Sequence, residues 1–367
     1  MTTRSLNMAL GLTALIATRP CMLHAEEVQA NLKGSGEVVV AVDGGSYEAA
    51  FRKAFFEPFT RDTGIKVVTA QVDTGKLLTS VQLGQPDADL TSVTGGEFPT
   101  WVNRGSVQGI DYSLFSAETL NGIPEQLRDK NGVGALLYAA VIAFNTTKYP
   151  FDGNYPKSWA DFYDAKKFPG KRGLPKCERV LAGGLFVGAL LADGVPKDKL
   201  YPLDIDRALT KIQTLMPDVG RWWSGGAEAP QGLISGDSDI TISFNGRIST
   251  AKSEGAPVGL TWEQSILQYD YWVIMKGTPN AENANKFLAY ISQPKPQADF
   301  ATAMHYGPVN KDAFKLLPKD LAADLPGSPA IADKQVFEDY TWWAGTQSDG
   351  RSNYDHALTR CVETLSQ

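Results

Sequence analysis

Asp270 is the residue whose type and surroundings point most directly to binding chemistry. It lies between Tyr269 and Tyr271, with Trp272 next along the chain. A desolvated ammonium group at such a carboxylate gains a charge-assisted hydrogen bond of about 1.5–3 kcal/mol. Contact with the aromatic faces adds about 0.5–2 kcal/mol. A solvated turn residue that caps the strand following it is the alternative interpretation of Asp270.

The sequence patterns that would indicate an enzyme are weaker than the evidence for a binding site at Asp270. His305 and His356 are not spaced as a metal-binding pair with cysteine or acidic partners. Thr74-Gly75-Lys76 resembles the tail of a phosphate-binding loop, but position 70 is alanine where that loop needs glycine. The sequence also contains no Gly-x-Ser-x-Gly elbow. We therefore expect no enzymatic activity, no metal and no cofactor, with an exported hydrolase kept as an alternative.

Residues 1–25 have the order of a cleavable secretory leader. Arg4 is followed by the apolar run Met8–Ala17 and by Leu23-His24-Ala25 before two glutamates. The apolar run is about half of what a membrane-spanning helix needs. Cleavage removes two arginines and no acidic residue, so the formal charge moves from −6 to −8. An acidic exported chain without a basic run argues against nucleic acid as a partner and favours a periplasmic location.

Cleavage after residue 25 of 367 leaves 342 residues, which favours two domains. Apolar β-branched runs alternate with helical patterns and short turns, which predicts an α/β fold with a parallel sheet. The expected strands are 36–43, 65–72, 88–93, 171–175, 239–244 and 271–275, and the expected helices include 47–63, 76–83, 181–193, 203–215, 281–292 and 296–304.

The chain leaves the first α/β unit through the apolar stretch 135–145 and returns near residue 275. This course predicts two lobes joined by two crossing strands, with a ligand cleft where the strands end. We expect residues 36–141 and 275–367 to form the first lobe and residues 142–274 the second. Cys177 and Cys361 remain in the mature chain, either as a disulfide or as two inert thiols.

Several stretches, in this order, resemble the periplasmic solute-binding proteins of ABC importers, in the extracellular family 1 group that binds spermidine, putrescine or 4-aminobutyrate. These stretches are VVVAVDGGSYEAAFRKAFFEPF from Val38, ALLADGVPKDKLYPLDIDRA from Ala189, WWSGGAEAPQGLISGDSDITISFNGR from Trp222, QYDYWVIMKG from Gln268 and YGPVN from Tyr306. The resemblance implies a type II periplasmic binding fold, a small-molecule ligand, an inner-membrane permease as partner and a monomer.

The resemblance also implies the pocket residues. Ser46 and Tyr47 follow the first strand at a helix N-terminus, where free N–H groups attract anions. Thr94 and Gly95 end the third strand, and a glycine there permits close approach of the backbone or serves a tight turn. The remaining expected contacts are Tyr138, Phe244 (a tryptophan in polyamine binders), Asn245, Asp270, Trp272, Tyr306 and Trp343. Each aromatic among them has core packing as its alternative role.

One segment departs from the polyamine binders. They carry acidic residues in the segment aligned with 176–184, which here reads Lys-Cys-Glu-Arg-Val-Leu-Ala-Gly-Gly. One acid opposite helix N-termini, with Lys176, Arg179 or Arg247 available for an anion, favours a ligand with one amine and one acid group. We therefore expect an ω-amino acid or a related amine, with putrescine or spermidine as the alternative.

Overall fold

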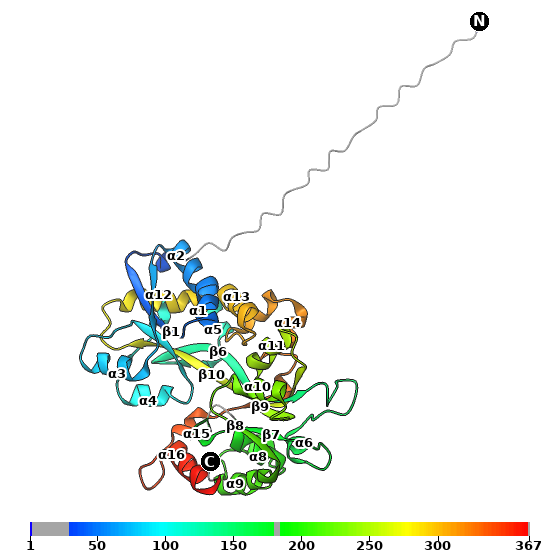
Figure 1. Cartoon of the computed structure of the whole chain (residues 1–367). Helices are drawn as coiled ribbons and strands as arrows, with labels where there is room; N and C mark the ends of the chain where they lie inside the picture. Colours follow the sequence, from blue (N-terminus) through cyan, green and yellow to red (C-terminus); the bar gives the residue numbers. More distant parts are fainter. Residues whose placement is uncertain (2–28, 180–183, 366–367) are drawn as a thin grey trace.

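The computed structural model describes residues 29–179 and 184–365, together with Met1. The rest of the expected leader lies outside these described residues. The described chain forms two lobes, drawn one above the other in Figure 1. No helix in this part of the chain combines the length and the apolar character that crossing a membrane requires.

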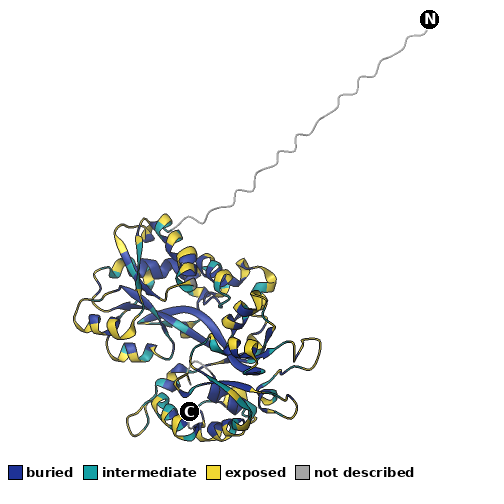
Figure 2. Ribbon diagram, viewed as in Figure 1, coloured by how far each residue is buried: buried dark blue, intermediate teal, exposed yellow. Residues whose placement is uncertain are grey.

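Two long antiparallel strands, β6 (Gly132–Asn145) and β10 (Val258–Met275), run through both lobes. They occupy the middle of one sheet, whose main strand order is β2-β1-β3-β10-β6-β9-β7-β8. Every residue of β6 except the last is buried, as the dark ribbon in Figure 2 shows, because its nearly continuous apolar sequence suits a strand covered on both faces. The expected two-lobe α/β fold is confirmed, although the second crossing strand begins well before the expected Tyr271.

The first lobe is built on three parallel strands, β1 (Glu37–Val42), β2 (Lys66–Gln71) and β3 (Leu90–Thr94). The phenylalanines between residues 51 and 59 recur at helical spacing, are at most 2 % exposed, and pack on Phe287 and Phe300. The helices of this part of the chain are α1 (Ser46–Phe51), the π-helical η2 (Arg52–Phe56), α2 (Glu57–Thr63), α3 (Thr74–Gln82), α4 (Phe98–Asn103), α5 (Ala117–Gly122), α12 (Ala281–Ile291), α13 (Pro294–Met304) and α14 (Lys319–Ala323).

The second lobe continues the same sheet with β7 (Arg172–Pro175), β8 (Val219–Trp223) and β9 (Ile240–Phe244). Its helices are α6 (Trp159–Tyr163), α8 (Leu185–Ala192), α9 (Ile205–Gln213), α10 (Glu228–Ser235) and α11 (Asn245–Ser253), and the 3-10 turn η5 spans Cys177–Arg179. The first turn of α9 is capped by Asp204, whose carboxylate accepts from the Arg207 N–H.

The end of the chain returns along the hinge to the second lobe. The short strand β11 (Val336–Phe337) pairs with β10, and helices α15 (Tyr340–Ala344) and α16 (Asn353–Leu365) follow. Helix α16 packs on α9, where Arg360 pairs with Asp206 at 2.8 Å. This position differs from the expected grouping of the last helix with the first lobe.

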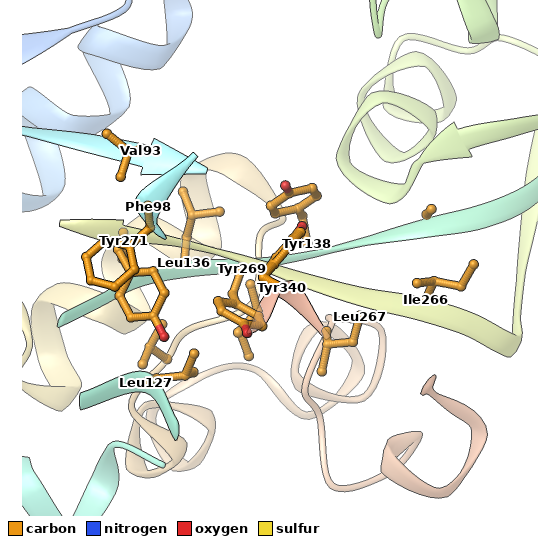
Figure 3. Close-up of a cluster of buried hydrophobic side chains, with 14 of the residues drawn as sticks. Val93, Phe98, Leu127, Leu136, Tyr138, Ile266, Leu267, Tyr269, Tyr271 and Tyr340 are labelled. Atoms are coloured by element: carbon orange, nitrogen blue, oxygen red, sulfur yellow. The ribbon is translucent and has the colours of Figure 1, made fainter. Parts of the chain in front are cut away.

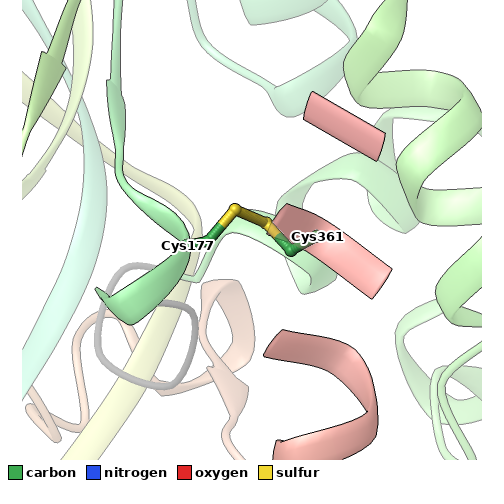
Figure 4. Close-up of a disulfide and its surroundings, with 2 residues drawn as sticks. All are labelled: Cys177 and Cys361. Atoms are coloured by element: carbon green, nitrogen blue, oxygen red, sulfur yellow. A yellow bond between two sulfur atoms is a disulfide. The ribbon is translucent and has the colours of Figure 1, made fainter. Parts of the chain in front are cut away.

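Cys177 of η5 and Cys361 of α16 form a disulfide, with their Cα atoms 5.8 Å apart (Figure 4). The structure thus selects the disulfide from the two alternatives that the sequence leaves open. A long-range bond of this kind depends on the tertiary fold, because 184 positions separate the two cysteines along the chain.

Candidate functional site

A cavity of about 160 Å³ lies where β1 and β3 end, at the edge of the sheet where α/β folds bind ligands. Its lining includes Asp43 and Tyr47 from the β1–α1 connection, Thr94 and Glu97 after β3, and Asp270 of β10. Two larger hollows, one beside the start of β10 and one beside α6 and α9, contain none of the expected site residues. We therefore take the cavity at Asp270 as the candidate site.

In the part of the chain that the structure describes, no positive charge is found to affect the ionisation of the Asp270 carboxylate. Its Oδ1 atom is enclosed and has no hydrogen-bond partner among the described residues. The pKa of Asp270 is raised to about 8, chiefly by burial and then by the negative charges of Glu97 and Asp43, and a hydrogen bond with Tyr138 partly offsets these effects. A cationic group in this cavity would stabilise the ionised form that the protein alone disfavours.

Four tyrosines surround this carboxylate, namely Tyr47, Tyr138, Tyr306 and Tyr340. Burial is the largest cause of the raised pKa of each phenol, and the negative charge of Asp270 contributes to all four shifts. Figure 3 shows Tyr138 and Tyr340 beside Tyr269 at the crossing strands. Tyr340 is absent from the sequence-based site, because nothing in the spacing of the chain links α15 to β10.

Arg247, in the first turn of α11, supplies a positive charge from the second lobe. Its charge lowers the pKa of Tyr306, against the dominant effect of burial. Within residues 29–179 and 184–365, its exposed guanidinium makes neither a hydrogen bond nor an ion pair. The Arg179 side chain is already engaged, because its Nε donates to the carbonyl of Ser224 at 2.6 Å. Of these two arginines, Arg247 is the one whose guanidinium remains available to an anionic ligand group.

Phe244 and Asn245 lie next to each other at the end of β9 but serve different purposes. The half-buried Phe244 ring lies 5.8 Å from the rings of both Tyr138 and Trp223. The Asn245 side chain is fully buried, accepts from the Ala139 N–H at 2.9 Å and donates to the His305 carbonyl at 3.0 Å. Phe244 therefore fits a pocket wall, whereas Asn245 joins separate backbone segments.

Trp272 and Trp343 are both 1 % exposed and lie in packed interior. The ring centroids of Trp272 and Phe51 lie 5.5 Å apart, and the Trp343 Nε1 donates to the Glu338 carboxylate at 2.7 Å. Gly95 is covered by Tyr340, since a Cβ at Gly95 would lie 2.2 Å from the Cδ2 atom of that ring. These positions favour support of the site over ligand contact.

The structure brings Tyr47, Thr94, Tyr138, Asp270 and Tyr306 together around one region. The backbone of Ser46 begins α1, and its side chain lies outside the described ones. Among the described residues, no group of three His, Cys, Asp or Glu side chains is arranged to hold a metal ion. The chemistry present is that of carboxylates, phenols and one guanidinium, and ligand contact by these residues stays a prediction.

Known proteins share this architecture. The gamma-aminobutyric acid-binding protein of Pseudomonas aeruginosa is 34 % identical over 328 residues, covering 87 % of this chain and 90 % of that protein. The spermidine/putrescine-binding periplasmic protein 1 of Haemophilus influenzae is 26 % identical, covering 82 % of each. An ABC transporter substrate-binding protein from Bradyrhizobium japonicum superposes with a TM-score of 0.82 at 33 % identity, over 90 % of this chain and all of that one.

A family model described as bacterial extracellular solute-binding protein matches residues 54–329. This match includes strands β2 and β3 of the first lobe and both crossing strands. It therefore includes Asp270 of β10, which lines the candidate cavity. The 34 % identical relative is similar over 87 % of this chain. The chain belongs to the bacterial extracellular solute-binding proteins.

Proposed function

We propose that this protein is a periplasmic receptor that binds a small solute with one amine and one acid group and delivers it to an ABC importer. The observation that carries the proposal is the placement of two ionisable groups that have no charge partner among the described residues. They are the Asp270 carboxyl on the first-lobe side and the Arg247 guanidinium on the second-lobe side, and both act electrostatically on Tyr306. A ligand with opposite charges at its two ends, such as an ω-amino acid, matches this arrangement.

Asp270 offers a ligand ammonium group the larger gain in binding free energy. The enclosed Oδ1 has no hydrogen-bond partner among described residues, so a ligand ammonium would supply both the missing donor and the missing charge. Removing one member of such a buried charge pair typically costs about 2–5 kcal/mol, equivalent to tens- to thousands-fold in affinity. Arg247 supplies a planar pair of donors that suits a carboxylate.

The relatives agree with an amine-containing ligand, since one is described as binding gamma-aminobutyric acid and another spermidine and putrescine. A polyamine remains the second candidate, because Asp43 and Glu97 add negative charge to the Asp270 cavity. We also propose that the receptor is a non-catalytic monomer, that it is located in the periplasm, and that its partner is an inner-membrane permease.

Calorimetric titration with 4-aminobutyrate and putrescine tests the assignment. We expect 4-aminobutyrate to bind wild type, Asp270→Asn to weaken it tens-fold or more, and Arg247→Gln to weaken it at least tenfold with little effect on putrescine. Arg179→Gln is the matched control, because Ser224 already engages that guanidinium.

Stronger binding of putrescine than of 4-aminobutyrate, unaffected by Arg247→Gln, would favour the polyamine alternative. Binding of neither probe, or chemical conversion of a bound probe, would contradict the proposed function. Chromatographic recovery of the unchanged ligand after incubation with the protein distinguishes a receptor from an exported hydrolase.

A further inference from the structure

A second buried carboxylate, Glu338, lies where the C-terminal segment crosses the hinge. Its side chain is 1 % exposed. Its Oε1 accepts hydrogen bonds from the Tyr201 hydroxyl at 2.8 Å and from the Trp343 Nε1 at 2.7 Å, and its Oε2 faces the Gln268 Nε2 at 3.4 Å. These donors come from the second lobe, from α15 and from β10, so one carboxylate joins three parts of the chain.

Among the described residues, no cation is found to affect the ionisation of this group. The titratable groups with an electrostatic effect on Glu338, or affected by it, are acids and phenols: Asp339, Tyr201, Tyr138, Tyr269 and Tyr340. Burial therefore raises the pKa of Glu338 to about 7, although its three hydrogen bonds lower it. A carboxylate held there by neutral donors alone changes its ionisation within the ordinary pH range.

The segment fixed by Glu338 continues directly into the candidate site. The Glu338 N–H donates to the Leu267 carbonyl at 3.0 Å, which extends the pairing of β11 with β10. Two residues later, Tyr340 covers Gly95, lies 5.0 Å from the Tyr269 ring and shares a hydrogen bond with Tyr138. Tyr138 in turn is hydrogen-bonded with Asp270.

The crossing strand provides a second connection to the same place. Gln268 is fully buried, lies directly opposite Tyr138 in the β6–β10 ladder, and precedes Asp270 by two positions. Side chains two positions apart on a strand lie on the same face. If Glu338 is protonated at Oε2, its O–H group and the Gln268 N–H group are two donors that face each other. The Gln268 amide must then rotate or move away from Glu338.

We propose that Glu338 is a positioning residue for the ligand site, and that its ionised carboxylate holds Tyr340 and Tyr138 in the arrangement that binds ligand, whereas its protonated form binds ligand more weakly. This inference rests on the receptor function proposed above. It adds to that function a control of affinity by pH that is separate from the Asp270 carboxylate.

The test compares wild type with Glu338→Gln, using 4-aminobutyrate as the probe from pH 5.5 to 8.5. We expect Glu338→Gln to weaken binding about tenfold at pH 8, within the range of coupling through packed networks. The ratio of the two dissociation constants should fall toward one near pH 5.5, because wild-type Glu338 is then protonated. Titration of Asp270 affects both proteins and largely cancels in this ratio.

Glu363→Gln, which removes an exposed acid of α16, is the matched control and should give a ratio of one throughout. A Glu338→Gln ratio that is one at every pH, or that differs from one without changing with pH, would overturn the inference, since a purely structural role predicts no pH dependence.

Should Glu338→Gln fail to fold, the variant Tyr201→Phe takes its place. It keeps the Glu338 carboxylate and removes one of its hydrogen-bond donors, so it should shift the midpoint of pH-dependent binding upward relative to wild type.

A measurement without ligand separates this inference from the receptor proposal. The Glu338 and Asp339 amides donate to the Leu267 carbonyl and to the Tyr201 hydroxyl, at 3.0 and 3.1 Å. After correction for the intrinsic exchange rate, hydrogen exchange at residues 336–340 should be slower at pH 8 than at pH 6 in wild type, with no such difference in Glu338→Gln. Equal pH dependence in the two proteins would contradict a role for Glu338, whether or not the probe binds.

Discussion

The raised pKa of Asp270 makes ligand affinity dependent on pH. The carboxyl of the free protein titrates at about 8, against 3.8 for an ordinary aspartate, chiefly because of burial. An ammonium ligand favours the ionised form, so binding near neutral pH must expel a proton from Asp270. We expect affinity for 4-aminobutyrate to rise with pH and to level off above about pH 8.

The size of this effect follows from the titration. Two units below its pKa a carboxyl is about 99 % protonated, so the apparent affinity at pH 6 should be about 100-fold below its limit, and at pH 7 about tenfold below it. Each unit corresponds to about 1.4 kcal/mol of binding free energy. Binding at pH 7 should release close to one proton from Asp270.

Titration calorimetry in buffers with different ionisation enthalpies measures both quantities, because the dependence of the observed heat on buffer gives the number of protons released. Measurement in the Glu338→Gln background removes the second buried acid from the profile. Asp270→Asn should bind weakly with an affinity that varies little between pH 6 and 8. Constant wild-type affinity over this range without proton release, or an unchanged slope in Asp270→Asn, would refute the reasoning.

The same shift affects the ligand-free protein in the opposite direction. Between about pH 4 and 8 the folded state holds more protons at Asp270 than the unfolded state does, so the free energy of unfolding falls as pH rises. This contribution to stability is complete below the unfolded pKa and is lost as pH rises through about 8. Urea unfolding of wild type and Asp270→Asn at several pH values measures the difference.

Three further predictions concern the scaffold. Replacing Cys177 and Cys361 by serine should lower the free energy of unfolding by about 2–4 kcal/mol in urea titrations, because the bond closes a loop with a sequence separation of 184. Arg172→Met should cost about 3 kcal/mol in the same assay, since its fully buried guanidinium donates to three backbone carbonyls. Gly95→Ala should cost about 1–3 kcal/mol and also weaken ligand binding, because the added methyl group displaces the Tyr340 ring; unchanged melting and affinity would contradict this.

The fold could be predicted from the sequence because the hydrophobic patterns of the individual strands and helices agree with the two-lobe arrangement that their order along the chain predicts. The apolar run 135–145 was expected to pass between the lobes and is a strand buried along almost its whole length, and the phenylalanines of residues 51–59 have helical spacing and form a packed helical face. The position of Asp270 in an aromatic stretch also identified it as a candidate, and the structure shows its carboxylate at the cavity.

The supporting residues were beyond local patterns. Tyr340 and Glu338 reach the crossing strands from a segment about 70 positions later in the chain, and no periodicity encodes such a contact. Aromatic residue type alone did not distinguish Trp272, which is packed against Phe51, from a pocket wall. The expected close approach at Gly95 occurs, but to the Tyr340 ring, which a single sequence does not specify.

The disulfide also constrains when the protein can finish folding. Cys361 follows Cys177 by 184 positions along the chain. In a chain that emerges from a translocation channel N-terminus first, as the expected leader would direct, the thiol of Cys177 must wait until a further 184 residues have crossed. During that interval it is available to pair with thiols of other proteins, so maturation of this receptor should depend on an oxidase that acts after translocation is complete.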